Sequence, residues 1–184
     1  MIRQKLWTSL ILFCGMFLFS ACSSGCAVPA EEEDSAAEDS GGSSRIYISD
    51  LGYSMEYDPT VFFALSDENS DGFGLRNEDV DAELSAGVTV ERVSGYTVKE
   101  YSEYITDRIS GGVWSVTEAE FGRDRKKATS VTYEEESSAG KVYYNDTLVK
   151  AGKDILVIRI TTYEGLPADV NEKINEMLAT FDVD

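Results

Sequence analysis

Apolar and polar residues alternate with the two-residue period of β-strands over most of the chain after residue 45. The pattern predicts strands at residues 46–48, 53–57, 61–65, 72–77, 84–93, 114–121, 128–134, 141–150 and 154–163. Ala151, Gly152 and Lys153 connect the last two of these strands as a hairpin. Residues 155–160 are apolar on both faces, which is typical of a strand in the middle of a sheet that is covered on both sides.

In two other segments the apolar residues recur with the period of a helix. The first helix is predicted to begin at Thr97, because Thr97 and Glu100 have the spacing of a capping box. Tyr96 and Tyr101 have the spacing of a hydrophobic staple, and the glycines at 111–112 predict the end of the helix. Its apolar face consists of Val98, Tyr101, Ile105 and Ile109. A second helix has Pro167 at a first-turn position and an apolar face formed by Val170, Ile174, Met177, Leu178 and Phe181. Residues 46–184 are therefore predicted to form one α+β domain, a β-sheet of about six or more strands with helices packed on it.

The first 21 residues have the composition of an export signal. Arg3 and Lys5 precede a largely apolar run at residues 6–19, which is shorter than the roughly 20 residues of a transmembrane helix. Residues 18–22, Leu-Phe-Ser-Ala-Cys, resemble the bacterial lipoprotein signal called the lipobox, with Phe19 at a position where Leu is usual. The resemblance implies that the signal peptide is cleaved between Ala21 and Cys22 and that Cys22 carries the lipid.

The alternative for this segment is an ordinary secretory signal in which Cys22 has no role. Cys26 fits the lipobox less well, because the residue three positions before it, Ser23, is not apolar. Three interpretations of Cys26 stay open: it takes a second acyl chain, it pairs with another molecule, or it has no role. Residues 22–45 are rich in Ser, Gly, Ala, Glu and Asp, and we expect them to form a disordered acidic linker with a reach of about 25 to 30 Å.

Charge and the missing residue types narrow the function. The chain has 34 acidic and 16 basic residues, a net charge of −18, so nucleic acid is not an expected partner. All three cysteines precede residue 27 and the chain has no histidine, so the domain lacks a cysteine nucleophile, the usual general base, the standard serine and cysteine triads and most zinc chemistry. An enzyme would depend on carboxylates alone, such as those of Glu118, Glu120 and residues 134–136, and their spacing identifies no catalytic pair. We therefore expect a domain that is not an enzyme.

Several segments together resemble the PsbP-like family. They are residues 51–59 (Leu-Gly-Tyr-Ser-Met-Glu-Tyr-Asp-Pro), the helix that begins at residues 97–101, the Phe121-Gly122 step, and the closing helix that ends in Thr180-Phe181. The namesake of the family is an extrinsic subunit of photosystem II, and its fold is shared with the Ran-binding protein Mog. The resemblance implies an α/β/α sandwich with an antiparallel sheet between helical layers, and a small module, not an enzyme, that binds or supports another protein. It carries over no site residues.

Residues 67–78 match the spacing of an EF-hand calcium loop. In this interpretation Asp67, Asn69 and Asp71 supply one side-chain oxygen each, and Glu78 supplies both carboxylate oxygens. An EF-hand needs a helix on each side, however, and the residues before this loop have the pattern of a strand. Asp, Asn, Ser and Gly also form the commonest turns, so the sequence favours a hairpin turn and leaves a weak extracellular calcium site as the alternative. No other cofactor is expected.

These observations predict a lipoprotein that is anchored in a bacterial cell membrane through its N-terminal lipid, with the domain on the extracytoplasmic side. The domain is expected to bind another protein or to assist an envelope complex. A calcium- or solute-binding lipoprotein and a carboxylate-based hydrolase are the alternatives. The basic cluster at residues 123–127 is interpreted as an exposed turn, or else as a docking point for an acidic partner. Trp114 and the tyrosines are expected to be core residues, with any exposed subset available for a protein or sugar contact.

Overall fold

The computed structural model describes residues 44–76, 85–109 and 113–183. In this part of the chain the elements follow one another in the order β1 Arg45–Ser49, β2 Tyr53–Tyr57, β3 Phe62–Asp67, β4 Ser70–Leu75, β5 Gly87–Val93, α1 Val98–Thr106, β6 Trp114–Phe121, β7 Lys126–Ser137, β8 Gly140–Ala151, β9 Asp154–Tyr163, α2 Ala168–Ala179 and β10 Asp182–Val183. Every strand that the alternation pattern predicts is present within this part of the chain. Neither helix is long and apolar enough to cross a membrane among the residues described.

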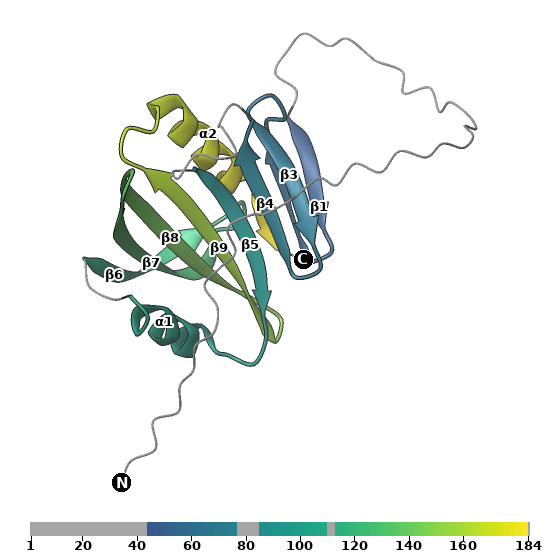
Figure 1. The fold of residues 1–184 in the computed structure, drawn as a ribbon. Coiled ribbons are helices and arrows are strands. Elements are labelled where there is room, and N and C mark those ends of the chain that lie inside the picture. The colour runs from purple at the N-terminus through teal and green to yellow at the C-terminus, as the bar shows by residue number, and fades with distance from the viewer. Residues whose placement is uncertain (1–43, 77–84, 110–112, 184) are drawn as a thin grey trace, which may run out of the picture. The chain divides into compact units, whose positions relative to one another are not determined.

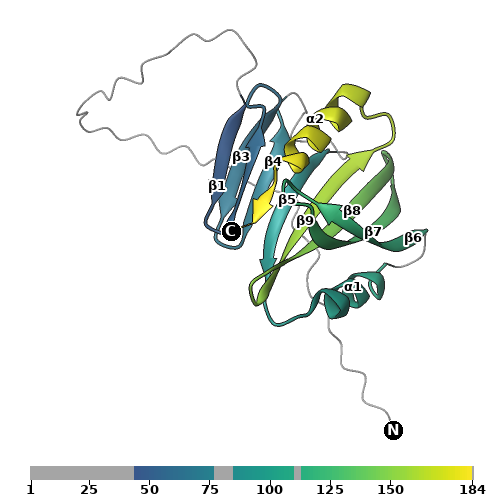
Figure 2. The ribbon, with the colours of Figure 1, turned by 180° about the vertical axis from the view of Figure 1, so that it is seen from behind.

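The strands form two antiparallel sheets. The larger sheet has seven strands in the order β3-β4-β5-β9-β8-β7-β6, and the smaller has three in the order β1-β2-β10 (Figure 1). The two helices lie on opposite sides of the larger sheet, as the view from behind also shows (Figure 2). The predicted α+β class, with an antiparallel sheet between helices, is confirmed. The short strand β10 and the separate sheet that it completes are features that the sequence pattern did not predict.

Strand β9 lies near the middle of the larger sheet, between β5 and β8, and is covered on both faces. Leu156 and Ile158 face a hydrophobic core shared with the smaller sheet and α2. Ile155 and Val157 face a second hydrophobic core, which includes Ile105 of α1. The run of apolar residues on both faces is thus explained, because each face of β9 has its own hydrophobic core.

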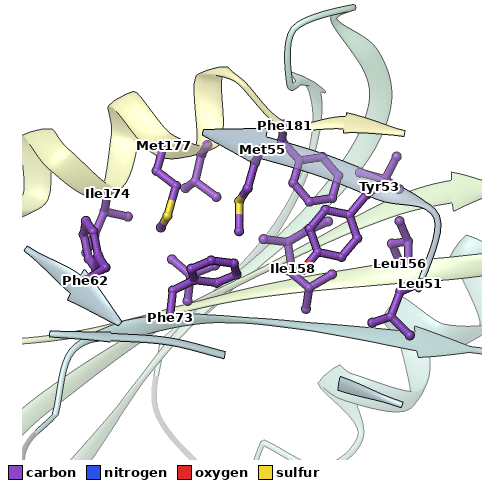
Figure 3. Packing of buried hydrophobic residues seen from close by; sticks show 14 of the residues in the cluster. Leu51, Tyr53, Met55, Phe62, Phe73, Leu156, Ile158, Ile174, Met177 and Phe181 are labelled. Carbon is purple, nitrogen blue, oxygen red and sulfur yellow. The ribbon is translucent and has the colours of Figure 1, made fainter. Parts of the chain in front are cut away.

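The larger core is filled mainly by aromatic, methionine and branched side chains. Figure 3 shows Met177 of α2 and Met55 of β2 opposite Phe73 of β4. Tyr53 of β2 and Phe181, which follows α2, are buried and stack with ring centroids 4.8 Å apart. Burying a side chain of this size contributes about 1.5 to 3 kcal/mol. The contacts in this core join the smaller sheet and α2 to one face of the larger sheet.

The start of α1 agrees with the sequence. The Thr97 hydroxyl accepts a hydrogen bond from the Glu100 N–H, and the Glu100 carboxylate accepts one from the Thr97 N–H, so the predicted capping box is confirmed. The rings of Tyr96 and Tyr101 are in contact, with centroids 5.4 Å apart, as the staple requires. Helix α1 ends at Thr106, before the glycines predicted to end it, and Ile109 still packs on the smaller core. Helix α2 runs from Ala168 to Ala179, so Pro167 is its N-cap rather than a residue of its first turn, and Phe181 lies beyond its end.

Candidate functional site

Strand β6 is one edge of the seven-stranded sheet, and it exposes more of its side chains than any other strand in the described part of the chain. Every residue from Trp114 to Glu120 is exposed. The Trp114 side chain is 50% exposed and that of Val116 43% exposed. Their cross-strand partners are Tyr133 and Val131 of β7, which pack in the smaller core beside α1. Trp114, Val116, Glu118 and Glu120 therefore project from the same face of the sheet as Tyr133 and Val131, the face that α1 covers in part.

A hollow lies at the beginning of this edge strand. It has a volume of about 330 Å³ and is lined by residues of β6, β7, β8 and β9 and by the residue before β6: Val113, Trp114, Ser115, Thr132, Tyr133, Glu134, Tyr143, Tyr144, Asn145, Ile160 and Thr162. Three of its lining side chains, those of Val113, Trp114 and Tyr143, are among the large apolar groups most exposed to solvent in the described residues. Tyr143, which lies opposite Glu134, projects from the other face of the sheet than Trp114 does. Trp114 and Val116 share one face of β6, and we call these two exposed apolar side chains the β6 patch. Apolar patches rimmed by polar groups are typical of interaction surfaces.

The polar groups in and beside the hollow are hydroxyls and an amide that bond to one another. The hydroxyl oxygens of Ser115 and Thr132 lie 2.6 Å apart. Asn145 accepts a hydrogen bond of 2.6 Å from the Ser130 hydroxyl. The carboxylate among the lining residues belongs to Glu134, whose Oε1 accepts a hydrogen bond from the Lys141 ammonium at 3.0 Å. The lining of the hollow thus combines neutral donors, acceptors and rings with the ion-paired carboxylate of Glu134.

The four residues of the calcium hypothesis do not share one environment. Asp67 ends β3 and Asn69 lies in the exposed turn between β3 and β4, which pair as an antiparallel hairpin. Asp71 lies in β4 and is only 2% exposed. Glu78 lies outside the described residues. Within those residues no group of three or more acidic, histidine or cysteine side chains is placed to hold a metal ion. The hairpin is as the turn interpretation expects, and the calcium site stays a prediction.

The Asp71 carboxylate is instead surrounded by hydroxyl groups. It accepts hydrogen bonds from Tyr47 at 2.8 Å, from Tyr53 at 2.7 Å and from Ser66 at 2.8 Å, and a fourth from Ser49. Burial acts to raise the pKa of Asp71, but the four hydroxyl hydrogen bonds act in the opposite direction and outweigh it, so the pKa lies below its ordinary value. Burial, followed by the contact with Asp71, raises the pKa of Tyr53. The cluster holds a charged carboxylate between the two sheets.

A second buried carboxylate is one that the sequence interpretation missed. Asp146 of β8 has no exposed surface, and Arg159 of β9 lies directly opposite it in the sheet. The guanidinium donates two hydrogen bonds, from Nε at 2.7 Å and from Nη2 at 2.9 Å, and these bonds raise the pKa of Arg159. Tyr101 and Tyr133 lie nearby, and burial raises the pKa of each. The signal in the sequence was a single charge, Arg159, within an otherwise apolar run.

The basic residues at 123–127 form the turn between β6 and β7 and the start of β7, as one interpretation expected. Their charges are largely used within the domain. Arg123 donates to the Glu56 carboxylate at 2.9 Å, and Arg125 lies 3.6 Å from the Glu120 carboxylate. Lys126 donates to the backbone carbonyl of Val183. Ala21, Cys22 and Cys26 lie outside the described residues, so cleavage and lipidation stay predictions.

Comparison with known proteins identifies the fold. No family model and no curated protein matches the chain significantly. Cyanobacterial PsbP (CyanoP) from Synechocystis sp. PCC 6803 has a similar structure, with 13% identity over 82% of this chain and 98% of that one and a TM-score of 0.53. The Saccharomyces cerevisiae Ran-binding protein Mog1p matches over 78% of this chain and 96% of that one, with 13% identity and a TM-score of 0.52. The domain has the PsbP and Mog1p fold.

A crystal structure from Bacteroides thetaiotaomicron is similar as well, with 14% identity over 76% of this chain and a TM-score of 0.53. This chain spans 48% of the length of that protein. At identities this low, the likeness concerns the fold alone.

Two of the segments that resemble PsbP-like proteins meet in this domain. The Arg123 N–H donates a hydrogen bond of 2.8 Å to the carbonyl of Phe181, and the rings of Phe121 and Phe181 lie 5.3 Å apart. Gly122, between Phe121 and Arg123, has a φ of +74°, and a Cβ there would lie 2.3 Å from the same carbonyl. Only glycine fits this conformation and this close approach. The Phe121-Gly122 step and the Thr180-Phe181 ending are therefore parts of one tertiary contact.

Proposed function

We propose that residues 46–184 are a protein-binding or accessory domain, not an enzyme, and that a lipid on Cys22 holds the domain on the extracytoplasmic side of a cell membrane. The observation that supports binding is the β6 patch, two exposed apolar side chains on a strand that closes the sheet among the strands that the structure describes. The fold supports it as well, since one protein with this fold, Mog1p, is a Ran-binding protein. Aromatic side chains such as that of Trp114 are enriched among the residues that dominate the free energy of binding between proteins.

Crosslinking in native membranes, followed by pull-down of the full chain, tests the binding role. We expect one protein to be recovered in stoichiometric amount with the wild-type chain. The double variant Trp114→Ser/Val116→Ser should lose it, because the substitutions remove the exposed apolar side chains of β6 while leaving the core intact. The matched control is Leu65→Ser, which removes a side chain that is 61% exposed at the opposite edge strand, β3. Equal recovery by the double variant and the control would contradict the proposal.

The anchor has a separate test. Cys22→Ser removes the thiol that takes the lipid in a lipobox, so the variant should be released from the membrane fraction or accumulate as the uncleaved precursor. Cys26→Ser is the matched control and should be processed and partition into detergent as the wild-type chain does. Normal processing and detergent partitioning of Cys22→Ser would show that Cys22 is not the lipid attachment site.

A further inference from the structure

The outer edge of β6 offers backbone hydrogen-bonding groups to an additional strand. Among the strands that the structure describes, β6 pairs with β7 alone and closes the sheet at this end. The unpaired side of such a strand presents a row of N–H and C=O groups that a further extended segment can use. Strand β6 is eight residues long and contains no proline, so the row is not interrupted.

One face of β6 divides into an apolar half and an acidic half. Trp114 and Val116 project from the first half, and Glu118 and Glu120 follow at the next two positions of the same face. Glu118 has no ion-pair or hydrogen-bond partner among the described residues. Glu120 lies 3.6 Å from Arg125, but both side chains are largely exposed. This ion pair therefore contributes little to stability, and Glu120 can pair with a basic group of a partner instead. The opposite face carries the small residues Ser115, Thr117 and Ala119.

We propose that β6 accepts an extended segment of the partner protein as an additional antiparallel strand, and that this segment carries basic residues opposite Glu118 and Glu120 and apolar residues opposite Trp114 and Val116. Opposite residues of an antiparallel pair lie on the same face, where unlike charges and apolar pairs stabilise the pairing. Read in its own direction, the segment has two basic residues at alternate positions followed by two apolar ones. This inference rests on the proposed binding function and names the chemistry of the partner.

A second copy of this chain does not fit the same edge. In a two-fold antiparallel pair of β6 strands centred on Thr117, Trp114 lies opposite Glu120 and Val116 lies opposite Glu118. A pair centred on Glu118 places two glutamates side by side, and one centred on Val116 again places Trp114 opposite Glu118. The net charge of −18 on each chain adds long-range repulsion. The charge pattern therefore favours a basic partner over self-association.

The test uses a labelled peptide and the full chain in detergent. The peptide is Ser-Lys-Thr-Lys-Thr-Val-Thr-Tyr with blocked ends and a fluorescent group at its N-terminus, and binding is followed by anisotropy. We expect saturable binding below about 1 mM peptide that weakens as salt is added. Replacing both lysines with glutamate, or the central threonine with proline, should abolish binding, because the first change reverses the charges and the second prevents strand pairing.

Variants of the chain separate charge matching from general attraction to an acidic protein. Glu118→Lys/Glu120→Lys should weaken binding of the lysine peptide about tenfold and should gain binding of the glutamate peptide. Glu164→Lys/Glu172→Lys makes the same change in net charge at exposed positions outside β6 and should leave both affinities unchanged. Equal effects of the two double variants, or no binding of the lysine peptide at about 1 mM, would overturn the inference. Sedimentation as a dimer that Glu118→Lys/Glu120→Lys strengthens would identify a second copy as the occupant instead.

The proposed function and this inference can fail separately. Should the native partner be lost with Trp114→Ser/Val116→Ser while the peptides bind without regard to charge, the binding role stands and the proposed chemistry of the segment is wrong. Should the native partner be retained by that variant, the binding role of the β6 patch itself is wrong.

Discussion

Asp71 and Asp146 are both buried carboxylates of the seven-stranded sheet, but they face opposite sides of it and are stabilised in different ways. Asp71 lies opposite Val90, which faces the larger core, and accepts hydrogen bonds from four hydroxyl groups. Asp146 faces the side of α1 and forms a two-bond ion pair with Arg159. One negative charge is thus stabilised by neutral dipoles, and the other by a positive charge.

The difference shows which contacts each aspartate joins. The hydroxyl donors to Asp71 come from β1, β2 and β3, so the carboxylate connects the smaller sheet to the larger. Asp146 and Arg159 are direct neighbours on β8 and β9, and their ion pair joins two strands that the sheet already pairs. We therefore expect loss of the Asp71 cluster to loosen the contact between the sheets. Loss of the Asp146 pair should destabilise the middle of the larger sheet.

Removing Arg159 is expected to have the largest effect. In Arg159→Met the carboxylate of Asp146 is left with no exposed surface and no positive charge, which costs about 3 to 5 kcal/mol of the free energy of unfolding. The double variant Asp146→Leu/Arg159→Met removes both charges and should recover most of this loss. Urea denaturation followed by circular dichroism measures both values. A double variant no more stable than Arg159→Met would show that the hydrophobic replacement does not fit this site.

Replacing the other partner of this ion pair, Asp146, should destabilise the domain less. The Arg159 side chain is 41% exposed, so in Asp146→Asn the guanidinium can donate its hydrogen bonds to water instead. We expect a loss of about 1 to 2 kcal/mol, measured by the same denaturation. At Asp71 no such asymmetry between charged partners exists, since all four donors to this carboxylate are neutral hydroxyls.

Asp71→Asn is expected to cost about 2 to 4 kcal/mol at neutral pH, because an amide presents one oxygen acceptor to four hydroxyl donors. The difference between wild type and variant should also depend on pH. The pKa of Asp71 is lowered by folding, so its contribution to stability is complete above the ordinary value of 3.8 and is lost as the pH falls through the lower pKa of the folded state. The difference in free energy of unfolding should therefore be constant at neutral pH and shrink below about pH 4. A difference that grows in acid would contradict this cluster.

The two aspartates also show what the sequence could and could not predict. The strands and helices follow from local periodicity and from caps such as Thr97, whose partners lie within a few residues. The donors to Asp71 include Tyr47 and Tyr53, which lie 24 and 18 residues away, so the oxygen-rich segment around Asp71 fits a cation and a ring of hydroxyls equally well. The spacing of residues along the chain cannot distinguish a cation site from a ring of hydroxyls, because tertiary contacts decide which groups surround Asp71.

The position of β6 at the edge of the sheet could not be predicted for a similar reason. The alternation of residues 114–121 predicts a strand correctly, but a strand at the edge of a sheet and one inside it have the same period. Strand order, which places β9 in the middle and β6 at the edge, depends on pairing between distant segments. Arg159 was the one visible clue to a buried pair, as a charge within an apolar run, and its partner could not be found without the register of β8 and β9.

Removing one hydroxyl of the Asp71 cluster should have a small effect, with Tyr47→Phe the smallest of all. Tyr53→Phe keeps the ring that stacks on Phe181 and removes one of four donors, so we expect a loss of about 1 to 2 kcal/mol by urea denaturation. Tyr47→Phe removes a donor that is only partly buried and should cost less, because water can reach that side of the carboxylate. If the four bonds act as one network, the double variant will lose more than the sum of the two single losses, since each remaining donor then stabilises a poorly solvated charge. If the loss in the double variant equals the sum of the two single losses, each hydroxyl stabilises Asp71 independently. The cluster would then be a set of separate pairwise contacts, like the pair of Asp146 and Arg159, and not a network.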